Sequence, residues 1–198
     1  MNKFGATEII AVTRAGWAEQ SRSLFAGALE VYDTEQWGTS YTLPVGENTT
    51  NQQSMFQHTG LTVMATVNGT VVQIDRAGNG FVDGVDGDVQ VTLDEGESYH
   101  FNGSPNPGNT GAGLLQGATL TATQPVQVDV ETGDNCAFFE SRWYAPFPDE
   151  SLDNEYYTTT GTNAGDPAFV WLHNPGASSI TITCEATAGF YIHLHRLG

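Results

Sequence analysis

The segment that decides the fold runs from residue 61 to residue 75, with the sequence Leu-Thr-Val-Met-Ala-Thr-Val-Asn-Gly-Thr-Val-Val-Gln-Ile-Asp. It contains two short runs rich in β-branched residues, Leu61–Val67 and Thr70–Asp75, which are separated by Asn68-Gly69. An Asn-Gly pair favours the backbone of a two-residue hairpin turn, and alternation of apolar and polar residues is typical of a half-buried strand. The segment therefore predicts a β-hairpin.

Runs of the same kind recur along the chain and predict about a dozen strands. Only Ala15–Ala28 has the composition of a short helix, and its Gly and Ser content weakens that helix. Many short strands at close spacing favour antiparallel sandwiches, so we expect an all-β fold with two antiparallel β-sandwich units of jelly-roll or immunoglobulin-like type. Besides the hairpin, the predicted strands are Glu8–Arg14, Ser40–Leu43, Val89–Leu93, Ser98–Phe101, Ala118–Ala122, Val126–Thr132, Glu140–Tyr144, Ala168–Asn174, Ser179–Glu185 and Phe190–Arg196.

An internal repeat is the most informative feature of the sequence. The stretch Tyr-Asp-Thr-Glu-Gln-Trp at 32–37, followed by Tyr41, recurs as Phe-Pro-Asp-Glu-Ser-Leu at 147–152, followed by Tyr156. Both pairs have the same offset, because 147 − 32 and 156 − 41 each give 115. Upstream, the end of a run at Gly16 matches the end of another at Gly133, at an offset of 117. One repeat is therefore about the size of a sandwich domain.

The repeat is out of phase with the ends of the chain. Residues 33–147 make one complete sandwich repeat, residues 1–32 correspond to the tail of a repeat, and residues 148–198 correspond to the head of another. Neither end alone can bury an apolar face, and an open sheet edge promotes association. We therefore expect the two ends to form a second, composite sandwich, either within one chain or between neighbouring subunits by strand donation.

Composition narrows the classes of partner. Among 198 residues, 6 are Lys or Arg and 23 are Asp or Glu, which gives a formal net charge of −17. This charge argues against nucleic acid and anionic membranes, both of which attract clustered cations. No apolar run is long enough to span a membrane, and the N-terminus lacks the apolar region of a signal peptide. Cys136 and Cys184 do not make a disulfide framework, so two free thiols are preferred over a single bridge.

Several stretches of the sequence resemble the β-sandwich repeats of the IgG-Fc-binding-protein N-terminal type, which occur in large prokaryotic surface proteins. The resemblance covers residues 30–185, and it implies extracellular, adhesive or structural use without catalytic residues. The absence of a signal peptide and the short, out-of-phase length leave a phage virion relative as an alternative. The stretches that carry the resemblance are Gly69–Asp75, the acidic Gly-rich turn at 78–88, Thr92–Tyr99, Gly117–Val128, Thr132–Asp134 and Glu140–Tyr144.

The acidic loop, residues 75–88, is the main candidate for a ligand site. Closely spaced carboxylate and amide oxygens around Gly turns can bind Ca²⁺, although the EF-hand spacing is absent. The favoured alternative is a hairpin whose Gly and Asn residues accept positive φ and whose acids are solvated. The candidate calcium ligands are Asp75, Asn79, Asp83, Asp86 and Asp88. No other cofactor is expected.

The remaining candidates concern interfaces and chemistry. His193 and His195, with His173, have the residue types of a transition-metal site, but paired surface or core histidines are the preferred interpretation. No nucleophile elbow, phosphate loop or zinc-protease motif occurs, so we expect no enzymatic activity. The strand ending at Trp143-Tyr144 is expected to pack into a sandwich. The candidate interface residues are the aromatic side chains of Trp17, Trp37, Tyr156 and Tyr157.

These observations predict a non-enzymatic structural or adhesive subunit of an extracellular, cell-surface or virion assembly that acts through protein–protein contacts. The expected partners are copies of the chain itself or other assembly proteins. One alternative is a phage capsid or tail decoration protein. A second alternative is a Ca²⁺-dependent carbohydrate-binding module.

Overall fold

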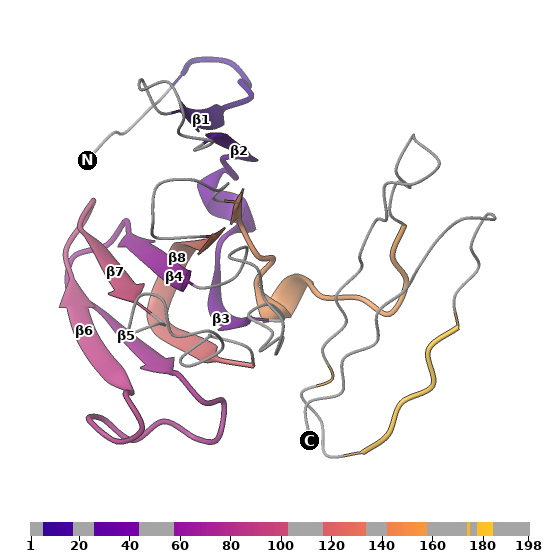
Figure 1. Ribbon diagram of the computed structural model, residues 1–198. Coiled ribbons are helices and arrows are strands. Elements are labelled where there is room, and N and C mark those ends of the chain that lie inside the picture. The colour runs from indigo at the N-terminus through magenta and orange to yellow at the C-terminus, as the bar shows by residue number, and fades with distance from the viewer. Residues whose placement is uncertain are drawn as a thin grey trace. The chain divides into compact units, whose positions relative to one another are not determined.

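The computed structural model describes residues 6–17, 26–43, 58–102, 117–133, 142–157, 174 and 178–183 (Figure 1). The chain divides into two compact units, Met1–Ser151 and Leu152–Gly198. All strands of the described residues lie in the first unit, and none of these residues forms an α-helix. In the part of the chain that the structure describes, no helix is long and apolar enough to cross a membrane.

The described residues of the first unit form nine strands and two short 3₁₀ helices. The strands are β1 (Thr13–Trp17), β2 (Ala26–Glu30), β3 (Gly38–Thr42), β4 (His58–Ala65), β5 (Thr70–Asp75), β6 (Val89–Leu93), β7 (Ser98–Asn102), β8 (Thr119–Gly133) and β9 (Arg142–Tyr144). The helices are η1 (Thr34–Gln36) and η2 (Asp149–Ser151). The two strands predicted on either side of Asn68-Gly69 are present as β4 and β5, and Gly69 has a φ of 72°. The predicted hairpin is wrong, because β4 pairs with β7 and β8 whereas β5 pairs with β6 and β8, so the turn connects two layers.

The long strand β8 organises a seven-stranded antiparallel sheet into two layers. Its first half pairs with β5 on one side and with β3 on the other. Its second half pairs with β4 and β9. Each layer is extended by one further strand, since β6 pairs with β5 and β7 pairs with β4. The pairs to β5 end at Ala122 and those to β4 begin at Val126, so Pro125 lies where the strand passes between layers. A proline, which cannot donate a ladder hydrogen bond, is tolerated at such a position.

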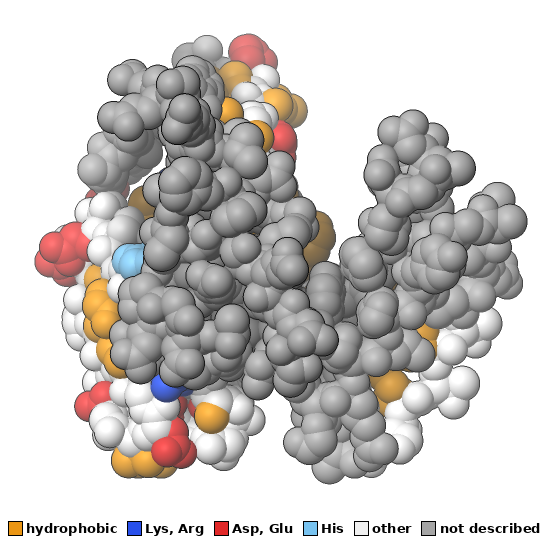
Figure 2. All heavy atoms as spheres, in the orientation of Figure 1, with side chains coloured by type: hydrophobic (Ala, Val, Ile, Leu, Met, Phe, Trp, Pro, Cys, Tyr) orange, Lys and Arg blue, Asp and Glu red, His pale blue; other side chains and the backbone are white. Residues whose placement is uncertain are grey.

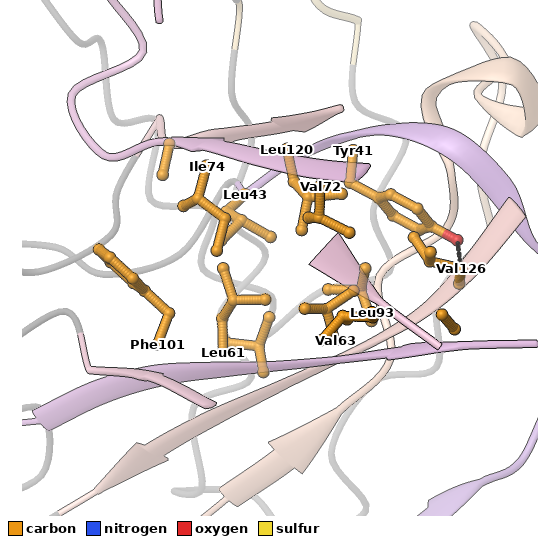
Figure 3. Close-up of a cluster of buried hydrophobic side chains, with 14 residues drawn as sticks. Tyr41, Leu43, Leu61, Val63, Val72, Ile74, Leu93, Phe101, Leu120 and Val126 are labelled. Atoms are coloured by element: carbon orange, nitrogen blue, oxygen red, sulfur yellow. Dashed lines mark hydrogen bonds between the residues drawn. The ribbon is translucent and has the colours of Figure 1, made fainter. Parts of the chain in front are cut away.

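The core lies between the two layers. In β5, the side chains of Thr70, Val72 and Ile74 are buried, whereas those of Val71 and Gln73 are half-buried. Figure 3 shows the side chains of the β5 and β3 layer facing those of the β4 and β7 layer. Each large aliphatic side chain removed from water contributes about 1.5–3 kcal/mol, so this cluster holds the layers together. Its members are Tyr41, Leu43, Leu61, Val63, Ala65, Val72, Ile74, Leu93, Phe101, Ala118, Leu120, Val126, Val128 and Val130.

The N-terminal part of the chain corrects the helix expected at Ala15–Ala28. In the described residues of this segment, β1 and β2 form an antiparallel hairpin, with Thr13 opposite Glu30 and Trp17 opposite Ala26. The Gly content makes the local preference for helix weak, so pairing with a neighbouring strand decides the conformation. In addition, β2 lies against β9. Tertiary pairing therefore overrides a weak local preference for helix.

Three other expectations on strands need revision. Ala118–Ala122 and Val126–Thr132 are parts of one strand, because the layers share β8. The N-terminal strand begins at Thr13 rather than Glu8, since β2 gives it no partner before that point. Residues 179–183 carry no strand, and the strands predicted for 168–173 and 190–196 lie outside the described residues. The all-β class and antiparallel pairing are confirmed, whereas the second, composite sandwich stays a prediction.

Candidate functional site

Asp75 is the organising residue of the acidic loop. Its side chain is only 5% exposed. Oδ1 accepts hydrogen bonds from the backbone N–H groups of Ala77, Gly78 and Asn79 at 3.2, 2.7 and 3.3 Å, and Oδ2 accepts one from Gly80 at 2.7 Å. Four backbone donors around one carboxylate satisfy its charge without a bound cation.

Asp88 plays a similar part on the return side of the loop. It is 3% exposed and accepts the N–H of Arg76 on Oδ1 at 2.9 Å and that of Val82 on Oδ2 at 2.8 Å. The other acids lie at the exposed rim, where Asp83 accepts from the Gln90 N–H at 3.3 Å. Two buried carboxylates therefore fix the turn through backbone amides.

The predicted calcium ligands do not gather around one point. Asp86 is exposed and accepts only a long bond of 3.4 Å from the Asn79 side-chain amide. Among the described residues, no group of three or more His, Cys, Asp or Glu side chains could hold a metal ion. The contacts favour a structural role for the loop, and calcium binding stays a prediction. Thermal stabilisation by millimolar Ca²⁺ would support it, and unchanged melting would remove it.

A second set of carboxylates connects η2 to the edge strand β3. Glu150 Oε1 accepts from Thr39 N at 2.8 Å and from Thr39 Oγ1 at 2.7 Å. Asp149 Oδ2 accepts from the hydroxyls of Ser40 at 2.6 Å and Thr42 at 3.2 Å. We call this set of contacts the β3 cap. Because β3 pairs only with β8 among the described strands, the cap covers its other edge, a common protection against unwanted strand pairing.

The electrostatics of the cap follow from these bonds. Partial burial raises the pKa of Glu150, but hydrogen bonds from the hydroxyl and N–H of Thr39 outweigh it, so that the pKa lies below its ordinary value of 4.5. The carboxylate form is therefore the one that holds β3.

Gly38 allows η2 to approach β3 closely. A Cβ atom placed on Gly38 would collide with Pro148 Cβ and would lie 2.6 Å from Glu150 Oε2. Any larger residue would push Pro148 away. The absence of a side chain at residue 38 is thus a packing requirement of the cap.

The N-terminal hairpin contacts the sandwich through Arg14. Its Nη1 lies 3.2 Å from Asp129 Oδ2 on β8, and its guanidinium carbon lies 4.9 Å from the ring centroid of Trp143 on β9. Burial raises the pKa of Asp129, while hydrogen bonds from Gln127 and Arg14 and the Arg14 charge lower it in part. We call this set of contacts the Arg14 clamp. A cation placed between a carboxylate and an indole ring fixes the hairpin on the two strands.

Aromatic stacking adds a contact between two further segments of this unit. The rings of Tyr32 and Phe147 stack with centroids 5.4 Å apart and an interplanar angle of 17°. Tyr32 precedes η1 and Phe147 precedes η2, at the predicted offset of 115. The two helices also begin 115 residues apart, at Thr34 and Asp149. Segments with the spacing of the predicted repeat therefore lie against each other.

The predicted interface residues occupy different environments. Trp37 is half-buried and donates its indole N–H to the Tyr32 carbonyl at 3.1 Å. Trp17 lies in β1, and its side chain is outside the described residues. Tyr156 and Tyr157 are 64% and 91% exposed. Only these last two present a described aromatic surface.

Several candidates lie outside the described residues, and several contacts were not anticipated. The structure does not describe His173, His193, His195, Cys136 and Cys184. Conversely, the β3 cap and the Arg14 clamp were missed. Arg14 and Asp129 are 115 residues apart, which equals the predicted repeat spacing. That spacing alone gives no reason to expect a contact between the two residues.

On the face shown in Figure 2, the described acidic side chains form several separate groups, with hydrophobic and neutral side chains between them. The candidate site is the set of contacts between segments that the β3 cap and the Arg14 clamp make.

Comparison with known proteins gives one match. The family described as IgGFc binding protein matches residues 27–145, which include all but the first residue of β2 and the whole of β3 to β9. No curated protein and no solved structure matches the chain significantly. The match covers more than half of the 198 residues, and the chain therefore belongs to the IgGFc binding protein family.

Proposed function

We propose that the protein is a non-enzymatic structural or adhesive β-sandwich subunit of an extracellular or virion assembly, and that it acts through protein–protein contacts. The family carries a binding activity in its name, which supports a protein partner. The chain uses Asp149 and Glu150, which follow the last strand of the sandwich, to close the edge of β3. This cap is the observation that carries the proposal, because it attaches η2, which follows the proposed repeat of residues 33–147, to β3 of that repeat.

The arrangement of repeats is part of the proposal. Residues 33–147 form the complete repeat, and residues 1–32 with residues 148–198 form the composite one. The helices η1 and η2 begin 115 residues apart, which equals the predicted repeat spacing and supports this division. The stacking of Tyr32 on Phe147, at the same spacing, also supports it.

Immunoglobulin Fc is a second candidate partner, favoured by the family name alone. Fc binding and self-assembly use different experiments, so both can be tested on the same material. The intact chain is immobilised and exposed to Fc, to Fab from the same antibody as a control, and to more of the chain itself. Binding of Fc but not Fab would add an adhesive role.

The test of the proposed function is the state of the native material. Electron microscopy and light scattering of the intact protein should show filaments, capsid-bound copies or another defined assembly. A monodisperse monomer at all concentrations, with no binding to Fc or to itself, would overturn the proposal.

A further inference from the structure

Tyr41 shows how a complete repeat anchors β3. Its hydroxyl accepts a hydrogen bond from Gly38 N at 3.0 Å and donates one to the Val126 carbonyl of β8 at 2.6 Å (Figure 3). The side chain is 2% exposed. The first bond shapes the start of β3, and the second attaches the strand to β8 across the core.

The first of these bonds recurs 115 residues later. The N–H of Asp153 donates to the hydroxyl of Tyr156 at 2.7 Å, and 153 − 38 and 156 − 41 both give 115. Tyr156 is, however, 64% exposed, and residues 152–157 carry no strand. The local geometry of the β3 start is thus formed without a β8-like strand to receive the tyrosine.

The N-terminal segment has the features of that receiving strand. At the offset of 117 that relates Gly16 to Gly133, Ile9 takes the position of Val126, since 126 − 117 is 9. β1, which follows, pairs antiparallel with β2, as β8 pairs with β9. Val126 is 0% exposed, but Ile9 is 102% exposed and residues 6–12 carry no strand. An apolar residue at a core position of the repeat is left open to solvent.

We propose that residues 153–157 of one copy dock on residues 6–12 of a second copy, with the Tyr156 hydroxyl donating to the Ile9 carbonyl. The register follows that of Gly38 opposite Val126 in the complete repeat. This inference rests on the proposed function and names the contact through which its subunits associate.

A second copy is the occupant because the segment that the repeat spacing places opposite Tyr156 belongs to this same chain, and both Ile9 and Tyr156 are exposed. Such a contact joins two different patches and is therefore head-to-tail, which produces rings or filaments. Docking buries Ile9 and the Tyr156 ring and extends backbone pairing, as in other cases of strand addition.

Four variants of the intact chain test the contact by sedimentation over a range of concentrations, in about 0.15 M salt to screen the acidic charge. Tyr156→Ala should weaken association on the order of a hundredfold, because it removes a buried aromatic anchor. Ile9→Asp should have a similar effect. The matched controls Tyr157→Phe and Ile10→Asp should change it less than about twofold, since side chains next to the contacting pair on extended segments face the opposite side.

Mixing the two damaged variants separates association between chains from closure within one chain. Ile9→Asp keeps an intact 153–157 segment, and Tyr156→Ala keeps an intact N-terminal segment. Each alone should be monomeric, and the mixture should form dimers with one good contact. Far-ultraviolet circular dichroism and melting of each variant establish that the sandwich is folded.

The outcomes are distinct. If the wild type associates but both damaged variants associate equally well, the contact proposed here is wrong while the proposed function stands. If both variants are monomeric and the mixture yields no dimer, the second copy is the wrong occupant. If the wild type is itself monomeric and binds no partner, both proposals are overturned.

Discussion

The acidic loop and the β3 cap both rely on carboxylates that accept hydrogen bonds, but they join residues at different separations. Asp75 and Asp88 accept from amides between 2 and 12 residues away. Asp149 and Glu150 accept from residues of β3 that lie 107 to 111 residues away. The first arrangement shapes a turn, whereas the second attaches one segment to another. Separation in the sequence therefore distinguishes a contact that shapes one loop from a contact that joins distant segments of the chain.

Removal of the Asp75 carboxylate should produce the largest effect. Asp75→Ala leaves four backbone N–H groups without their acceptor and should reduce the free energy of unfolding by about 3 kcal/mol. Urea unfolding followed by tryptophan fluorescence measures the loss. Asp83→Ala, in the exposed rim of the same loop, is the matched control and should cost less than about 0.5 kcal/mol. Equal losses in the two variants would contradict the central role of Asp75.

Overpacking of the β3 cap should come next. Gly38→Ala forces the new Cβ against Pro148 and should destabilise the protein by about 1–3 kcal/mol. The change in the urea midpoint gives the value, and Pro148→Gly in the same background should recover part of it because the colliding ring is gone. If Gly38→Ala is as stable as the wild type, η2 does not approach β3 closely in solution.

The Arg14 clamp should contribute less, because its guanidinium is more than half exposed. Arg14→Ala should cost about 1 kcal/mol through the loss of the Asp129 ion pair and the contact with the Trp143 ring. Arg14→Lys keeps the charge and should cost less. A double-mutant cycle with Asp129→Asn isolates the ion pair, and additive losses in that cycle would show that the two residues do not interact.

Acid should release the cap with the smallest effect. The pKa of Glu150 is lowered in the folded protein, so its stabilising contribution is fully present above about pH 4.5 and is lost as the pH falls through the folded value. The contribution should stay below about 1 kcal/mol because the carboxylate is largely exposed.

The measurement is the difference in unfolding free energy between the wild type and Glu150→Gln from about pH 3 to pH 6. This difference should shrink toward low pH. Burial raises the pKa of Asp129, which acts in the opposite sense, but Asp129 is present in both proteins and cancels. A difference that grows on acidification would contradict the assignment.

The sequence was sufficient where neighbouring residues carry the information. The alternation in Thr70–Asp75 and the Gly residues of the acidic loop gave β5 and its hairpin with β6, because turn chemistry and side-chain period act over a few residues. The Asn68-Gly69 turn was interpreted wrongly as a hairpin, because β4 and β5 pair with different halves of β8. The helix predicted at Ala15–Ala28 is wrong at its two described ends, 15–17 and 26–28, where pairing between β1 and β2 gives strand. The predicted strands also divided β8 in two at Pro125, because the sharing of one strand by two layers is not a local property.

By itself, the sequence determined the all-β class, the positions of β5 and β6 and the formal net charge of −17. These depend on composition and on the alternation of side chains within short runs. Only the tertiary structure decided that Tyr41 is buried and Tyr156 exposed, and that Glu150 closes the edge of β3. The physical reason is that burial and edge pairing depend on which distant strand packs against a residue. Tyr41 and Tyr156 each accept a hydrogen bond from the backbone N–H three residues earlier, but only Tyr41 is buried.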